Sequence, residues 1–458
     1  MIQRSRNEAL PRECTYKLKE KFMSNYPEGL DHAIEHGFYD AVFQRRSRRF
    51  GLGMEIEKGP LQYKSKHDAI PLSELEEAIL VWTGLGIKNI NLSDFPPHVG
   101  LDLEMQFTSK TIPALGDVHR TELFYTNDDG LYMIKMHDKR AEDFEGLEKM
   151  TRHQRMDRIL ELFRKSRIKL SEGRADLPSK PPGIAAHNLW NVNKPGTTVF
   201  MPVTDLSACI INLYFFYMRP DHRFNFVDEL HRLRHPGTTH WLEKGFLDKS
   251  KRMPLVEAEL RFANGYIAEQ AFMGQNMVLA LQTLGLGGWL FSGFASMFML
   301  GGTPFNRGLG FRFVTPKIQG DTGNPNPVAV GRDNLFQAFC PPYYKDMGEA
   351  VEAFNDMKWT NWESHKLPYR DPTGVLAEVE RPSKDEIQVV KDICNYVYDT
   401  YGRFPAFSDP MFLRFMVQAH HLDLDFYDKY YPPGAYTDAH KNHFARWHPD
   451  IPDPFSGG

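Results

Sequence analysis

The chain has few cysteines, little net charge and no repeated segment. Its four cysteines lie far apart and form no Cys-x-x-Cys pair, so the sequence indicates neither a zinc knuckle nor a disulfide scaffold, and it favours a reducing, cytoplasmic location. The 55 Lys and Arg residues nearly balance the 59 Asp and Glu residues, so no global field favours nucleic acid or an anionic membrane as a partner. Residues 1–26 alternate in charge and lack an apolar core, which is not the pattern of a signal peptide.

Charge is missing altogether from one long stretch, Ala271 to Asn306. Within it, residues 284–301 approach the roughly 20 apolar residues that a membrane span needs. The stretch also holds seven glycines and several polar side chains, and it lacks basic flanks. We therefore expect buried core here, and no membrane partner.

Two local patterns predict their structures clearly. Ser73 is a good N-cap with Glu76 at the capping-box position, which predicts a helix from residue 73 that ends at Gly84 and Gly86. Two apolar runs surround the turn residues 127–130, which predicts a β-hairpin over residues 122–135.

The remaining patterns predict further elements but leave one undecided. Asp205 to Met218 is apolar throughout and fits a helix or a strand equally well. The other expected elements are helices within 16–50 and over 150–168, 257–284 and 384–401, and strands over 197–203 and 324–331.

Arginine is unusually concentrated in the run Arg45-Arg46-Ser47-Arg48-Arg49. Four guanidinium groups in five positions form an always-charged donor array that suits phosphate oxygens, and the hydroxyl of Ser47 adds another donor. Such a run is also found as a solvated basic patch, so the run alone does not decide between the two.

A second segment begins at Glu269 and is apolar on every face, which is typical of a helix in a protein interior. The glycines at 285, 287, 288 and 293 then end the helix and allow close approach of the backbone to a ligand or to another helix. The spacing of residues 285–288 mimics a dinucleotide-binding loop, but it follows a helix rather than a strand, so a Rossmann site is excluded.

Taken together, the arginine run, the helix at 73–80 and the glycine-rich segment resemble the nitroreductase-like FMN oxidoreductases. The matching pieces are R-R-S-x-R at 45–49, N-x-x-L-A-x-x-x-L-G-L from Asn276, and the short loop after it. Residues 112–123 are similar to a turn of the azoline-dehydrogenase branch, although this chain has Ala114 where a serine is usual. The resemblance covers roughly residues 40–345, in patches.

The resemblance implies an α+β fold with a mixed, mainly antiparallel sheet flanked by helices. It implies a nitroreductase-like core over 41–346 with an insertion at about 140–250, a helical arm over 1–40, and a helical, aromatic and His-rich extension over 347–458. It further implies a homodimer with FMN at the subunit interface.

The resemblance also assigns residues to the cofactor. Arg45 and Ser47 would meet the FMN phosphate, and Arg49 would lie near the pyrimidine end of the isoalloxazine, where a cation stabilises the reduced flavin. Ser292 and Gly293 would present backbone N–H groups near flavin N5. The full set of cofactor-binding candidates is Arg45, Arg46, Ser47, Arg49, Pro113, Ala114, Leu115, Gly116, Asn276, Ser292, Gly293, Arg332 and Lys345.

The implied function is an FMN-dependent oxidoreductase that transfers hydride through N5 by a ping-pong reaction, on a specialised heterocyclic or aromatic small molecule. The alternatives are an NAD(P)H-dependent nitro or quinone reductase and, from another class, a flavin-free binding or scaffold protein. His119, Tyr125 and Tyr214 are catalytic candidates only because they are polar groups near the expected cofactor region.

Two polar segments fall outside these motifs. The loop 188–198 is polar and aromatic, and it either lines a substrate pocket or is a capped surface loop. The tail carries histidines and aspartates that could bind zinc or non-haem iron. Their spacing matches no compact site, so the sequence predicts no metal; these residues are His420, His421, Asp423, Asp425, His440, His443 and His448.

Overall fold

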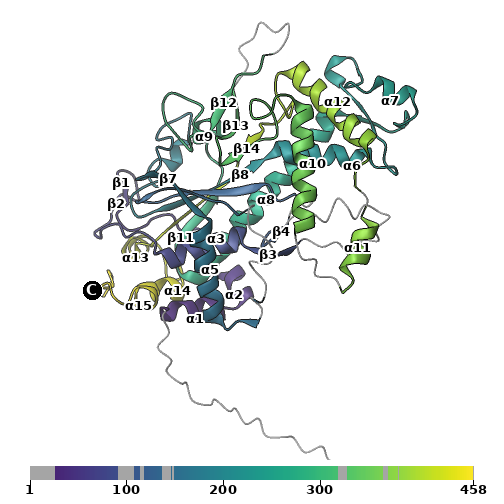
Figure 1. Ribbon diagram of the computed structural model, residues 1–458. Coiled ribbons are helices and arrows are strands. Elements are labelled where there is room, and N and C mark those ends of the chain that lie inside the picture. The colour runs from purple at the N-terminus through teal and green to yellow at the C-terminus, as the bar shows by residue number, and fades with distance from the viewer. Residues whose placement is uncertain are drawn as a thin grey trace, which may run out of the picture.

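A seven-stranded antiparallel sheet forms the centre of the protein (Figure 1). The computed structural model describes residues 26–90, 108–113, 118–136, 146, 149–317, 327–364, 370–379 and 381–456. The sheet has the order β11-β16-β8-β5-β6-β7, with β15 also paired to β8. The strands are β5 (Thr121–Thr126), β6 (Gly130–Ile134), β7 (Arg167–Glu172), β8 (Thr198–Asp205), β11 (Gly287–Phe291), β15 (Met411–Phe412) and β16 (Met416–His420).

Smaller sheets and helices surround this sheet, and the predicted α+β class is confirmed. One pair, β9 (Asn225–Val227) with β10 (Arg252–Pro254), is parallel. The other short strands are β1 (Glu55–Ile56), β2 (Tyr63–Lys64), β3 (Ile87–Ile90), β4 (Thr108–Lys110), β12 (Arg312–Val314), β13 (Val328–Arg332) and β14 (Phe336–Gln337). The helices are α1 (Glu28–Glu35), α2 (Phe38–Gln44), α3 (Glu74–Leu85), α5 (Arg152–Ser166), α6 (Leu206–Met218), α7 (Thr239–Glu243), α8 (Leu255–Leu284), α9 (Ser296–Leu300), α10 (Met347–Ser364), α11 (Pro372–Glu378), α12 (Lys384–Tyr401), α13 (Leu424–Tyr430), α14 (Asp438–Lys441) and α15 (His443–Trp447).

Both faces of the central sheet are buried. Successive side chains of a strand point to opposite faces, so one strand contributes to two cores. On β5, Phe124 belongs to one apolar core while Leu123 and Tyr125 belong to another. Helices α6, α10 and α12 gather on the side of the first core, and α1, α3 and α5 gather on the side of the second (Figure 1). The long helix α8 contributes side chains to both cores and so joins the two halves.

The start of α3 follows the predicted capping box. The backbone N–H and the hydroxyl of Ser73 both donate to Oε2 of Glu76, at 2.7 and 2.8 Å, and Ser73 Oγ accepts from the backbone N–H of Glu76 at 3.3 Å. The end of the helix differs from the prediction, because Gly84 lies inside α3 and only Gly86 caps it. A Cβ at Gly84 would lie 2.7 Å from Met277, so this glycine allows α3 to pack closely against α8.

The hairpin prediction is confirmed by β5 and β6, whose turn is held by Asn127. Its side-chain oxygen accepts the N–H groups of Asp129 and Gly130 at 3.0 and 3.1 Å. The undecided segment after Asp205 is the helix α6. Asp205 caps it by accepting the N–H groups of Ser207 and Ala208, and this local capping distinguishes a helix from a strand where periodicity does not.

The C-terminal region takes part in the central sheet. Strand β16 lies between β11 and β8, so the sheet crosses the boundary that the sequence suggests at residue 346. After β16, helix α13 packs Phe426 against Phe50, with ring centroids 4.1 Å apart. In the part of the chain that the structure describes, no helix combines the length and hydropathy of a membrane span.

Candidate functional site

The arginine run is an extended segment that follows α2, and its side chains alternate in environment. Arg45, Ser47 and Arg49 are exposed, whereas Arg46 and Arg48 are partly buried. Arg46 donates to backbone carbonyls at the end of α2, including that of Gln44 at 2.7 Å. An extended chain points successive side chains in opposite directions, so three of the five side chains face solvent together.

The inward-pointing Arg48 is fixed by the C-terminal region. Its Nε donates to the carbonyl of Ala435 at 2.5 Å, and its guanidinium lies 5.6 and 5.5 Å from the ring centroids of Tyr427 and Tyr431. The backbone N–H of Phe50 also donates to the Tyr427 hydroxyl at 3.0 Å. Arg48 thus anchors the run and leaves its neighbours available.

The run lies directly beside the glycine-rich end of α8. Gly288 N–H donates to the carbonyl of Arg48 at 2.9 Å, and the two residues form an antiparallel bridge. The Arg49 guanidinium lies 5.2 Å from the ring centroid of Trp289. Gly285 ends α8 with φ 78°, a left-handed conformation that favours glycine. The two motifs of the resemblance, far apart in sequence, are therefore neighbours in space.

The loop 188–198 lines a cavity next to this region. The cavity has a volume of about 590 Å³, within the range of small-molecule sites, and its walls include Trp190 and Lys194 opposite residues 53–58. Trp190 also stacks on Phe50, with centroids 6.1 Å apart. Gly293 lies close to the same loop, since a Cβ there would be 2.9 Å from Asn188 Nδ2. The loop is therefore a cavity wall as well as a surface segment.

Other cofactor candidates lie away from the run. Asn276 donates to the carbonyls of Thr83 and Thr111 and lines a second cavity of about 350 Å³ beside α1 and α2. Arg332 donates to the carbonyl of Leu309, and Lys345 is exposed next to the start of α10. Pro113 is exposed, and Ala114, Leu115 and Gly116 lie outside the described residues.

The three catalytic candidates are buried in the interior. Tyr125 and Tyr214 are fully buried in different cores, and burial raises the pKa of both phenols. His119 lies with its Nδ1 3.6 Å from Glu269 Oε1, and both residues are buried. Among the described residues, no hydrogen bond, ion pair or ring contact joins these three side chains to the arginine run, and their catalytic role stays a prediction.

His420 is a residue that the sequence did not single out for this region. It ends β16 opposite Gly287, and its ring lies 6.2 Å from that of Trp289. Within the described part of the chain neither ring nitrogen has a hydrogen-bond partner, and burial lowers the pKa of His420 to about 3, so the ring is neutral. His420 is the last residue of β16 and His421 follows it directly, so alternation along an extended chain points the two side chains in opposite directions.

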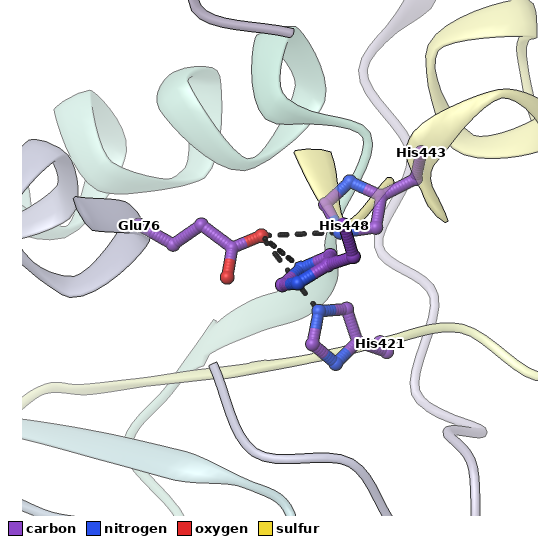
Figure 2. Close-up of side chains that lie close together, drawn as sticks. All are labelled: Glu76, His421, His443 and His448. Carbon is purple, nitrogen blue, oxygen red and sulfur yellow. Dashed lines mark hydrogen bonds and ion pairs between the residues drawn. The ribbon is translucent and has the colours of Figure 1, made fainter. Parts of the chain in front are cut away.

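The structure also brings three C-terminal histidines together. His421, His443 and His448 lie together in the interior, with their rings directed at one carboxylate oxygen of Glu76 (Figure 2). His440 is outside this group, and its Nδ1 lies 2.8 Å from the hydroxyl of Thr437. Sequence spacing did not reveal the group, because its fourth member is a capping residue of α3 and carries no metal-binding pattern of its own.

Comparison with known proteins gives little further information. No family model matches the chain, and no curated protein matches it. Among solved structures, one similar chain is described as a "putative nitroreductase" from Ralstonia eutropha JMP134, with 11% identity over 58% of this chain and 74% of that one. The TM-score is 0.26, which is too low for the likeness to carry an argument.

Proposed function

We propose that the chain is an FMN-dependent oxidoreductase whose cofactor is held by the arginine run and the loop after α8. The observation that carries the proposal is the pairing of Arg48 with Gly288, which sets three exposed polar side chains beside the glycine-rich end of a buried helix. A solvated basic patch needs no such partner.

The donor set fits the anionic end of FMN. Arg45 Nη1 lies 3.3 Å from Ser47 Oγ, so a guanidinium and a hydroxyl are already side by side on the exposed edge of the segment. An arginine fork donates two parallel hydrogen bonds to a phosphate, and the hydroxyl adds a third. In the proposal, Arg45 and Ser47 bind this phosphate.

Arg49 has a different task in the proposal. Its guanidinium is held over Trp289, next to the backbone that follows α8. A fixed cation at the pyrimidine end of the ring system stabilises the negative charge of the reduced state. Bound FMN would supply hydride transfer through its N5 atom.

The cavity beside Trp190 supports a flat heterocyclic or aromatic substrate. Its wall combines the indole ring of Trp190 with charged side chains of both signs, so it offers an apolar face and several polar groups; the charged residues are Glu55, Glu57, Lys58 and Lys194. Aromatic walls with a few placed polar groups are typical of small-molecule sites. We assign this cavity to the substrate rather than to the cofactor phosphate.

The proposed assembly is a homodimer. Helix α2, which leads into Arg45, exposes three large side chains, with 69% of Phe38, 72% of Tyr39 and 76% of Phe43 accessible to solvent. A contiguous exposed apolar surface of this kind is typical of an interaction site. A second copy of the chain covering α2 would also bring its own surface next to the arginine run.

The test is the flavin content and redox behaviour of the purified full chain. We expect FMN in the extract of the denatured protein, and flavin bleaching when the holoprotein is mixed anaerobically with NADPH, NADH or a candidate substrate. Bleaching by a nicotinamide supports the reductase subclass, and bleaching by substrate alone supports a dehydrogenase. Protein without flavin that takes up none on soaking would contradict the proposal and favour a binding or scaffold protein.

A further inference from the structure

A carboxylate and three imidazoles meet in the interior (Figure 2). Nε2 of His443, His448 and His421 lies 3.1, 3.2 and 3.7 Å from Oε1 of Glu76. The four ligand atoms all lie within 4.8 Å of one another, and no member of the group is more than 9% exposed. A buried cluster of this kind must be neutralised or bonded internally.

Two of the rings are oriented from behind by backbone carbonyls. Nδ1 of His421 lies 2.9 Å from the carbonyl of Ile70, and Nδ1 of His443 lies 2.8 Å from the carbonyl of Leu284. A carbonyl only accepts hydrogen bonds, so each Nδ1 carries the hydrogen. In a neutral imidazole the other nitrogen, Nε2, then has a lone pair and no hydrogen.

These lone pairs face another acceptor. Nε2 of His421 and of His443 have no hydrogen-bond partner among the residues that the structure describes. They point at Oε1 of Glu76, whose second oxygen is already used by both donors of Ser73. Acceptors that face one another in a buried space are unfavourable unless a proton or a metal cation lies between them.

We propose that Glu76 Oε1 and the Nε2 atoms of His421, His443 and His448 bind a Zn²⁺ ion. Imidazole nitrogen and carboxylate oxygen are both zinc ligands, with bonds of about 2.0–2.2 Å, so neighbouring ligand atoms of a tetrahedral site lie about 3.3 Å apart. The separations of 3.1, 3.2 and 3.7 Å from Oε1 match this spacing. Carbonyl partners on the far ring nitrogens are also typical of zinc-bound histidines.

The site is closed and therefore structural. Four protein ligands complete a tetrahedron, and burial leaves no approach for a substrate. The ion would join the first turn of α3, the end of β16 and the segment from α15 to His448. It would hold the C-terminal segment on the core, where His443 also contacts the end of α8.

The test is metal analysis of the full chain without a histidine tag, expressed in zinc-supplemented medium and measured by inductively coupled plasma mass spectrometry. We expect about one zinc per chain after gel filtration, and a thermal midpoint that a strong zinc chelator lowers. His443→Ala should lose at least nine-tenths of the zinc. His440→Gln, a buried histidine of the same segment outside the group, should keep it.

A second variant, His448→Cys, tests the zinc site if His443→Ala does not fold. His448→Cys retains a ligand, so it should fold and bind Co²⁺ with an added near-ultraviolet thiolate-to-cobalt band that the unmodified chain lacks. Zinc below about one-tenth per chain, together with no cobalt band and no effect of chelator on the thermal midpoint, would overturn the inference and leave a proton-linked ion pair cluster.

Discussion

The arginine run and the histidine cluster differ in exposure and in the chemical groups that they offer. The run offers three exposed donors on one side of an extended segment, anchored by the inward-pointing Arg48. The cluster has no exposed face, and its acceptors are oriented toward one point. An open set of donors is suited to a ligand that exchanges, whereas a closed set of acceptors is suited to an ion that stays.

The two regions are also physically joined. The backbone N–H of Leu52 donates to the carbonyl of His421 at 3.1 Å, and Arg48 reaches Ala435. The segment 421–435 therefore contacts the proposed metal site at one end and the proposed cofactor site along its length. This arrangement allows each region to be disturbed separately and its effect on the other to be measured.

The largest effect is expected from Glu76→Gln, which removes a buried charge from the cluster but keeps an acceptor for Ser73. We expect the free energy of unfolding to fall by about 3 kcal/mol. Removal of one partner from a buried charged cluster leaves the other groups uncompensated, which destabilises a fold by this amount. Urea denaturation measures it. Glu257→Gln, on the exposed first turn of α8, is the matched control and should change little. Equal stability of the two variants would show that the cluster does not stabilise the fold.

The next effect concerns the tuning of the cofactor. Arg49→Ala should retain FMN but lower its two-electron reduction potential by about 30 mV, equivalent to about 1.4 kcal/mol, because the cation that stabilises the reduced ring is gone. Spectroelectrochemistry measures the potential, with Arg261→Ala on the exposed face of α8 as control. An unchanged potential would contradict the placement of Arg49 next to the ring.

A smaller effect tests the link between the two regions and depends on both proposals. Removal of zinc from the holoprotein should weaken FMN binding by about threefold, roughly 0.7 kcal/mol, because the segment 421–435 supports the arginine run. Flavin fluorescence titration of metal-free and zinc-reconstituted protein measures it. Identical affinities would show that the regions are independent despite their contacts.

A pH-dependent effect on stability concerns Glu77, the neighbour of Glu76 that stays outside the cluster. Burial raises the pKa of Glu77 to about 7, although Asn127 and Thr198 donate to it. The native state then binds more protons than the unfolded state between about pH 4.5 and 7, so this carboxyl's contribution to stability is lost as the pH rises through that window.

Glu77→Gln removes this dependence and keeps an acceptor for both donors. At pH 8 the variant should be more stable than the unmodified chain by about 3 kcal/mol, because each unit of pKa shift corresponds to about 1.4 kcal/mol, and at pH 4.5 the two should be equal, as measured by urea denaturation. A variant that is less stable at pH 8 would show that the carboxylate is favourably held when charged.

Local chemistry explains which parts of the structure the sequence predicted. The capping box of Ser73 and Glu76 and the turn at Asn127 depend on neighbouring residues, and both are present as predicted. The place of β16 inside the sheet was missed, because an aromatic, His-rich tail carries no strong strand period. Its position is decided by pairing with β8 and β11.

Of the two candidate sites, the arginine run could be predicted from the sequence, whereas the histidine cluster could not. The resemblance placed the arginine run with the end of α8, and Gly288 does pair with Arg48. The histidine cluster combines a helix cap with residues from the end of the chain, and no spacing rule connects them. Glu76 could be predicted as a cap but not as a member of the cluster, because its Oε1 atom meets the histidines only when the chain is folded.

Calorimetric titration of FMN into the flavin-free full chain, alongside Arg45→Ala and the control Arg261→Ala, tests directly whether the arginine run binds the cofactor. We expect one FMN per chain, an affinity at least tenfold lower in Arg45→Ala because a charge-assisted hydrogen bond to the phosphate is lost, and no change in the control. No FMN binding, or binding that Arg45→Ala leaves unchanged, would contradict this expectation.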